Sequence, residues 1–155
     1  MEFRRNDYGF PVTDDRIPLH TSDATNSRIY DRTLRNLRPF VGASHSAINA
    51  RIAELHREWD IERTMGASGA GLALLGFALG LTVDRKYFAL PALVAASLFQ
   101  HAVQGWSPPL PVLRRVGVRT SAEIHGEILA LRILRDDFSI RARGAEAALS
   151  LALAQ

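Results

Sequence analysis

The sequence predicts an all-helical membrane protein, in which a two-helix transmembrane hairpin is flanked by amphipathic cytoplasmic helices. Residues 65–83 form a run of nineteen positions without a charged side chain, and residues 87–106 form a second run of twenty. Only the triplet Asp84-Arg85-Lys86 separates the two runs. A helix needs about 20 predominantly apolar residues to cross a hydrocarbon core of roughly 30 Å. Each run therefore just suffices to span a bilayer, and the charged triplet is predicted to form the turn of a hairpin over 65–106.

The composition limits the chemistry that the chain can perform. The overall averages, 47% hydrophobic and 23% charged residues, conceal an apolar middle between two polar arms. The sequence contains no cysteine, which excludes thiol catalysis, disulfides, iron-sulfur ligation and thiolate zinc sites. The net charge is +3, but the basic residues are spread along both arms without clusters. Nucleic-acid binding requires a clustered basic face, and we expect no nucleic-acid partner.

Residues 1–43 are predicted to form an extended polar N-terminal arm. This segment contains Pro11, Pro18 and Pro39, and its seven arginines are balanced by six acidic residues. It has too little apolar surface to offset the entropy cost of ordering, although a short helix is expected over residues 27–37. The acidic residues near the start, without an apolar stretch, predict that there is no cleavable signal peptide.

Residues 44–64 are predicted to form an amphipathic juxtamembrane helix, capped by Ser44 or Ser46. Apolar residues recur at helical spacing along one face of this segment: Ile48, Ile52, Leu55 and Trp59. Such a helix either lies at the membrane interface or packs on the C-terminal helix of the same chain. The pattern leaves both alternatives open.

Small residues recur along one face of the first apolar run, at Gly69, Ala73, Gly76 and Gly80. Helices in lipid associate by close backbone approach, which small residues permit. These four residues are therefore predicted to form a helix-packing face. It contacts either the second span of the same hairpin or a helix of another subunit.

A polar stripe is predicted near the end of the second run, at Ser97, Gln100, His101 and Gln104. Polar residues inside a membrane are candidates for function, and His101 is the residue that could ligate haem or a metal, or relay protons. The alternative is hydrogen bonding between helices near the wet interface. A lone histidine without a second ligand favours this alternative.

Residues 107–155 are predicted to be a proline-rich stop followed by cytoplasmic helices. Trp59, Trp106, Arg114 and Arg115 are predicted to anchor the hairpin at the membrane interface. Six arginines flank the hairpin within about twenty residues of its two ends, whereas the turn contains only two basic residues, Arg85 and Lys86. By the positive-inside rule both termini are cytoplasmic.

A capping box at Thr120-Ser-Ala-Glu123 predicts the start of a helix. Its apolar face is formed by Ile124, Ile128, Leu131, Leu134 and Phe138. Residues 145–154 are apolar but too few to span a bilayer, and they form either a packing helix or a frayed tail.

Three stretches are distinctive: Arg57-Glu-Trp-Asp-Ile-Glu-Arg63, residues 100–117 with their Trp-Ser-Pro-Pro motif, and Arg119-Thr-Ser-Ala-Glu-Ile124. Through them the sequence from residue 57 to residue 138 resembles the YgaP-like inner-membrane transmembrane domain family, a membrane domain of unknown function. It implies a self-associating two-helix hairpin in a bacterial cytoplasmic (inner) membrane, sometimes fused to a rhodanese sulfurtransferase domain. Many members end the second span in Cys-Pro, whereas this chain has Ser107-Pro108, so cysteine chemistry is not available at this position.

No catalytic constellation is evident, and we expect neither an enzyme nor a bound cofactor or metal. Glu123 and Glu127 share a helix face with Arg119 and Arg132 nearby, which predicts solvated ion pairs rather than acid-base chemistry. The leading hypothesis is a scaffold or accessory subunit of a larger inner-membrane complex, for example a respiratory or electron-transfer complex. Its partners would be lipid and other integral membrane subunits, or a second copy. The alternatives are an anchor that recruits a rhodanese-like sulfur-transfer enzyme, and a haem or quinone site at His101.

Overall fold

The computed structural model describes residues 16–136 and 144–153, and the chain divides into two compact units. The first comprises Met1–Ser22 and Asp60–Val118, and the second comprises Asp23–Trp59 and Arg119–Gln155. The described residues form helices and connecting turns, with no strand among them. The predicted all-helical class is therefore confirmed.

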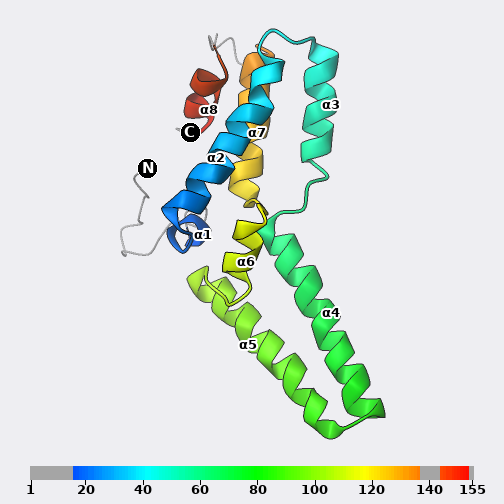
Figure 1. The fold of residues 1–155 in the computed structure, drawn as a ribbon. Helices are drawn as coiled ribbons and strands as arrows, with labels where there is room; N and C mark the ends of the chain where they lie inside the picture. The colour runs from blue at the N-terminus through cyan, green and yellow to red at the C-terminus, as the bar shows by residue number, and fades with distance from the viewer. Residues whose placement is uncertain (1–15, 137–143, 154–155) are drawn as a thin grey trace. The chain divides into compact units, whose positions relative to one another are not determined.

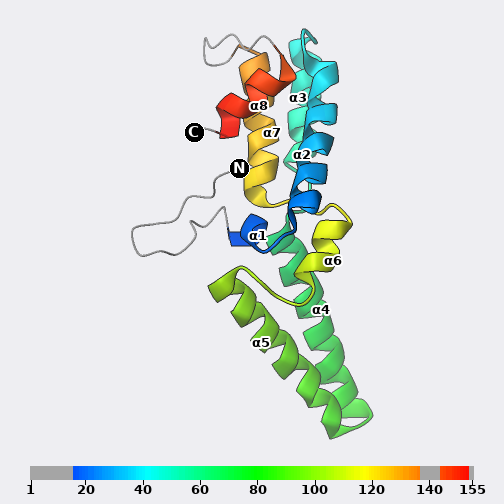
Figure 2. The same cartoon turned by 60° about the vertical axis from the view of Figure 1, so that its left-hand side comes forward.

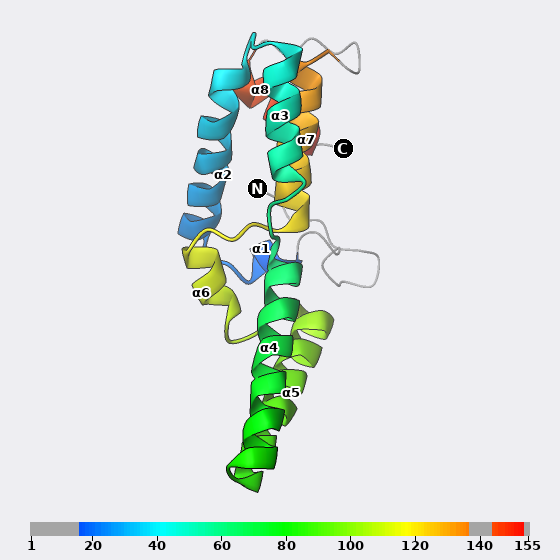
Figure 3. The ribbon, with the colours of Figure 1, turned by 90° about the vertical axis from the view of Figure 1, so that its right-hand side faces the viewer.

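The second unit is a small helical bundle around one apolar core. It contains α2 (Asp23–Leu37), the 3-10 helix η2 (Arg38–Phe40), α3 (His45–Leu55), α7 (Ser121–Leu134) and α8 (Ala145–Leu153). Helices α2, α3 and α8 all pack on α7, as Figures 2 and 3 show. The core is built from buried aliphatic residues of these four helices, including Leu37, Ile48, Leu55, Leu131, Ile133 and Leu149.

The prediction of an extended arm is wrong for the part of residues 1–43 that the structure describes. Residues 23–37 form a single helix, which includes the short helix expected over 27–37. Only one face of α2 is buried, through Ile29, Leu34 and Leu37 together with two threonines. The face is narrow and the rest of the helix is polar, so the helix is stabilised by packing on α7 rather than by its own composition.

The predicted juxtamembrane helix is also corrected, because it ends at Leu55 instead of continuing to residue 64. Ser44 caps its start, accepting a hydrogen bond from the Ala47 amide as predicted, and Ile48 and Ile52 face α7. Of the two alternatives, packing on a helix of the same chain is the one the structure shows. Beyond Leu55 the chain leaves the helix, and Trp59 is 48% exposed.

The capping box and the helix that it starts agree with their prediction, and the structure decides between the two alternatives for residues 145–154. Thr120 and Glu123 form both reciprocal hydrogen bonds of the box, and Ile124, Ile128 and Leu131 are buried. Phe138 lies outside the described residues. Residues Ala145–Leu153 form a packing helix, with Ala148 and Leu149 in the core.

The first unit contains the hairpin. Its elements are α1 (Arg16–Leu19), α4 (Ile61–Thr82), the 3-10 helix η3 (Arg85–Phe88), α5 (Ala89–Gln104) and α6 (Leu110–Arg115). Helices α4 and α5 are antiparallel and joined by a tight turn, from which they diverge (Figure 1). Ile17, Ile61, Met65 and Leu110 form a small core that holds α1 and α6 against the first turns of α4.

The two arms of the hairpin differ from the predicted runs 65–83 and 87–106. Helix α4 begins at Ile61, because the Asp60 carboxylate accepts a hydrogen bond of 2.8 Å from the Arg63 amide and caps the helix. Helix α5 has only 16 residues, and Gly105, with φ +71°, ends it in the left-handed conformation. Among the described residues, α4 is the one helix long and apolar enough to cross a membrane.

Candidate functional site

The glycine face of α4 is buried against α5. A Cβ atom added to Gly76 would lie 2.6 Å from Cδ of Pro91, and one added to Gly80 would lie 2.8 Å from the Phe88 ring. A Cβ on Gly69 would lie 2.9 Å from Cδ1 of Leu98. A Cβ at any of the three positions would force a neighbouring side chain to shift, and at Gly76 the neighbour is the Pro91 ring. Ala73, which lies between them, is half-buried. The predicted packing face therefore contacts the second arm of the same hairpin, and it is not free to dock on another subunit.

The outward side of the hairpin is a belt of exposed apolar side chains. Leu81 is 79% exposed, Phe99 72% and Leu74 71%. The other large members of this belt are Leu72, Leu75, Phe77, Val83, Leu93 and Val103. An apolar surface of this extent is unfavourable in water and marks a site of contact with lipid or protein.

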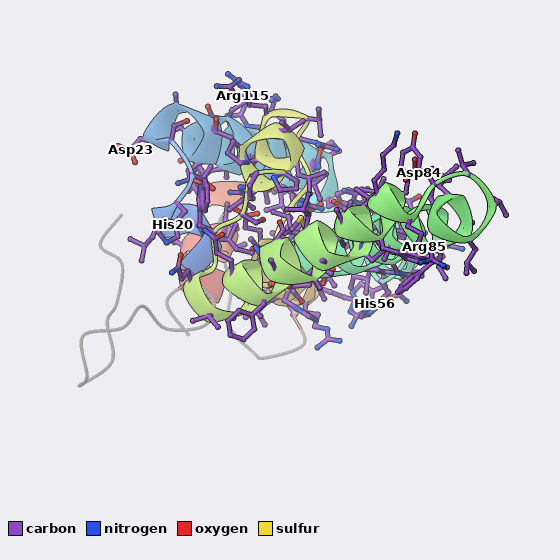
Figure 4. The ribbon with its side chains drawn as sticks, turned by 90° about the horizontal axis from the view of Figure 1, so that it is seen from below. His20, Asp23, His56, Asp84, Arg85 and Arg115 are labelled. Atoms are coloured by element: carbon purple, nitrogen blue, oxygen red, sulfur yellow. The ribbon has the colours of Figure 1, made fainter. Side chains whose placement is uncertain are left out.

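Charged side chains are concentrated at the turn of the hairpin. Asp84 caps η3 by accepting a hydrogen bond of 2.8 Å from the Lys86 amide, and its carboxylate lies 3.5 Å from the Lys86 ammonium group. Asp84, Arg85 and Lys86 are all exposed, and Figure 4 shows Asp84 and Arg85 at the turn end of the helices. The apolar belt is thus bounded by a hydrophilic tip.

His101 is the most buried member of the predicted polar stripe, at 5% exposure. Its Nδ1 lies 3.4 Å from the hydroxyl of the buried Ser107. Its Nε2 makes no hydrogen bond, although the Glu62 carboxylate of α4 lies 3.4 Å away, within ion-pair distance of a protonated imidazole. Ser97 and Gln100 are half-buried and Gln104 is exposed. The structure thus gathers His101, Ser107 and Glu62 rather than the four residues of the stripe.

The C-terminal end of α5 is held by α1. The Arg16 guanidinium donates a hydrogen bond of 2.6 Å to the carbonyl of Ala102, where the helix dipole favours a cation. Gly105 lies directly against Arg16, since a Cβ there would be 2.5 Å from the Arg16 Cβ. The position requires glycine for both its backbone conformation and this close approach.

The predicted interface anchors behave differently from one another. Arg114 is only 1% exposed, and its Nε donates a hydrogen bond of 3.2 Å to the Thr21 hydroxyl, so it pins α6 inside the first unit instead of reaching toward headgroups. The prediction for Arg114 is therefore wrong. Arg115 is exposed and projects from α6 (Figure 4), and Trp106 is half-buried beside the small core.

A buried ion network in the second unit was not predicted as such. Glu127 is fully buried, and its carboxylate binds Arg119 and, at 2.8 Å, Arg51. Arg119 also binds the Glu58 carboxylate at 2.5 Å and donates to the Thr33 hydroxyl at 3.3 Å. The pairing of Glu127 with Arg119 is therefore buried, not solvated. The position of Glu127 on the same helical face as Ile124 and Leu131 was the signal available in the sequence.

The network shifts the pKa of three of its members. Burial alone would raise the pKa of Glu58, but the hydrogen bond and charge of Arg119, together with the charges of Arg32 and Arg51, hold it below its ordinary value. Burial opposes the charged form of Arg119 as well, yet Glu58 and Glu127 raise its pKa. The pKa of Arg51 is raised against burial by Glu127 and Glu54. All three groups are therefore charged at neutral pH.

No protein-family model, no curated protein and no solved structure matches this chain. The resemblance to the YgaP-like family therefore remains a prediction from the sequence. Fold and site together define an all-helical protein with a glycine-packed hairpin, of which one helix is long and apolar enough to span a membrane.

Proposed function

We propose that the chain is a non-enzymatic integral membrane protein, a scaffold or accessory subunit whose hairpin is embedded in a bacterial inner membrane. The observation that carries the proposal is the apolar belt around α4 and α5, which is exposed while the glycine face is packed inside. In water this arrangement is the reverse of an ordinary helical hairpin, which buries its largest apolar side chains. In lipid it is the favourable one, because lipid solvates large side chains and small residues mediate helix contact.

The lengths of both arms are compatible with a bilayer. Helix α4, with 22 residues, extends about 33 Å. Helix α5 alone extends about 24 Å, and the four residues of η3 add up to about 8 Å. The second arm thus approaches the roughly 30 Å of a hydrocarbon core only when the 3-10 turn is counted.

Membrane topology is the direct test. The chain has no cysteine, so Lys86→Cys at the turn and Arg132→Cys on α7 each create a unique, exposed thiol. In intact cells we expect a membrane-impermeant maleimide to label Lys86→Cys from outside, and to label Arg132→Cys only after permeabilisation. Labelling of both variants in intact cells, or release of the protein by carbonate, would contradict a spanning hairpin with cytoplasmic ends.

A structural role fits the charged groups of the second unit. The four members of the buried ion network form ion pairs with one another: Arg51, Arg119, Glu58 and Glu127. None of these four is therefore available as an isolated acid, base or nucleophile. The accessory-subunit role is tested by purifying the tagged chain from native membranes in mild detergent. We expect a stoichiometric complex with other integral membrane proteins, and recovery of only a monomer or homodimer would eliminate this role.

A haem or quinone site at His101 is a second candidate, favoured by the buried Nε2 without a hydrogen-bond partner. The Glu62 carboxylate lies 3.4 Å from this nitrogen and would have to move to admit a ligand. Purified protein would then show Soret absorbance or bound quinone that is lost in His101→Ala. A colourless, quinone-free preparation from native membranes would remove this candidate.

A further inference from the structure

An apolar groove of about 210 Å³ lies between the arms of the hairpin, in the half that is farther from the turn. It is lined by Met65, Gly69 and Leu72 of α4 and by Leu93, Val94 and Leu98 of α5. Pro108 and Pro109, which follow the end of α5, lie along one side of it. Figures 1 and 2 show α4 and α5 separating in this direction from the turn.

None of the residues that the structure describes fills this groove. Closer approach of the two arms is blocked at Gly76, where the Pro91 ring already lies at contact distance, and at Gly69, where Leu98 does. The polar side chains in the lining are Ser68 and Ser97, and the Ser68 hydroxyl already donates to the Thr64 carbonyl at 2.7 Å. An ordered water needs two to four polar partners, and the lining of this groove offers few.

The groove is continuous with the apolar belt. Leu72 and Leu93 line the groove, and they are also exposed on the outer surface of the hairpin, at 48% and 68%. A molecule that solvates the belt can therefore enter the groove from the side without crossing a polar barrier. An unfilled groove would leave its lining without van der Waals partners.

From these observations we propose that the groove binds one acyl chain of a membrane lipid, held between α4 and α5 as a fixed part of the folded hairpin. This inference rests on the proposed membrane insertion. It goes beyond insertion because an ordinary lipid-facing surface exchanges its lipids freely, whereas an acyl chain in the groove is contacted by two helices and a proline segment and should exchange more slowly.

The test uses the full chain in liposomes that contain a phospholipid with a diazirine halfway along one acyl chain. After transfer into detergent without that lipid, irradiation labels only retained lipid, and peptide mass spectrometry maps the adducts. We expect at least fivefold more adduct at Val94 and Leu98 of the groove than at Leu81 and Phe99 of the belt. Equal labelling of groove and belt after the transfer would overturn the proposal.

Two matched variants test whether the acyl chain of the lipid lies in the groove. Ser97→Leu fills the groove and should lower its adduct at least fivefold, whereas Ala95→Leu, on the exposed side of α5, should change it less than twofold. If Ser97→Leu fails to fold, Ser97→Cys is blocked with N-ethylmaleimide after folding, with Ala95→Cys as control. Unchanged groove labelling in the filled protein contradicts the proposal.

The other occupants give distinct results. Disulfide-linked dimers of Ser97→Cys under mild oxidation would place a second copy in the groove. Reaction of the same thiol with a charged maleimide as fast as that of Lys86→Cys would show a water-filled groove. Either result overturns the acyl-chain proposal. Failure of membrane insertion is recognised separately, because belt residues would then carry no adduct even in liposomes before transfer.

Discussion

Gly76 is the position on the glycine face of α4 where one added methyl group would make the closest contact. In Gly76→Ala the new Cβ would lie 2.6 Å from Cδ and 3.1 Å from Cγ of Pro91, and 3.0 Å from the Leu90 Cβ. These atoms belong to a ring and to a backbone-proximal carbon, so they cannot move aside by changing a rotamer. We expect α4 and α5 to be forced apart, at a cost of about 1–3 kcal/mol typical of overpacking.

Gly71→Ala on the same helix is the matched control. Gly71 is exposed, and a Cβ there would meet nothing within 4 Å. Both variants gain the same helix propensity, up to about 1 kcal/mol in water. The difference between their unfolding free energies therefore isolates the clash. Gly69→Ala should fall between them, because the atom it meets is the flexible end of Leu98.

Opening of the hairpin can be followed by energy transfer between dyes on Ala67→Cys and Gln104→Cys, two exposed positions on the two arms. Increasing mole fractions of dodecyl sulfate in mixed micelles separate the arms. The midpoint for Gly76→Ala should lie clearly below those of the unsubstituted chain and of Gly71→Ala. Coincident midpoints for the two glycine variants would refute the inference that the glycine face of α4 is packed against α5.

Three further predictions concern the second unit, with hydrogen exchange of α7 in the full chain as the measurement. Glu127→Gln removes the fully buried one of the two carboxylates that pair with Arg119 and should cost about 2 kcal/mol. Glu54→Gln at the exposed end should change stability by less than about 0.5 kcal/mol. Equal effects would show that burial of the network is unimportant. The pKa of Glu58 is lowered in the folded chain, so its carboxylate stays charged to lower pH there than in the unfolded chain. Its contribution to the free energy of unfolding is therefore fully present above about pH 4.3, and it is lost as the pH falls through the pKa of the folded chain. Glu58→Gln should weaken this acid dependence, and an unaltered pH profile would contradict the assignment. Thr120→Ala removes the capping box and should cost about 1 kcal/mol, so unchanged exchange in the first turn of α7 would argue against the cap.

Local signals in the sequence predicted several elements correctly because their physical causes are local. The capping box at Thr120, the cap at Ser44 and the small-residue face around Gly76 each depend on residues within one or two helical turns. The cap at Asp60 is an equally local signal, but the predicted helix over residues 44–64 runs through it. It would have separated α3 from α4 and corrected the predicted helix over residues 44–64.

The candidate groups at His101 and Glu127 show the opposite case. His101 was predicted to belong to a stripe on its own helix, but its neighbours Glu62 and Ser107 come from α4 and from the loop after α5. Glu127 was predicted to be solvated, but Arg51 of α3 and Arg119 enclose it. Arg114 was predicted to face headgroups, and Thr21, far away in the chain, holds it inside.

By itself the sequence determined that the chain is helical, that its middle is apolar, and that glycines line one face of α4. These properties follow from helical periodicity and side-chain size, which neighbouring residues fix. Only the tertiary structure decided which helix covers the glycines, which charges are buried, and that polar residues 23–37 fold as a helix. Such outcomes depend on contacts between segments distant in sequence, and their desolvation and packing free energies exist only once those segments meet.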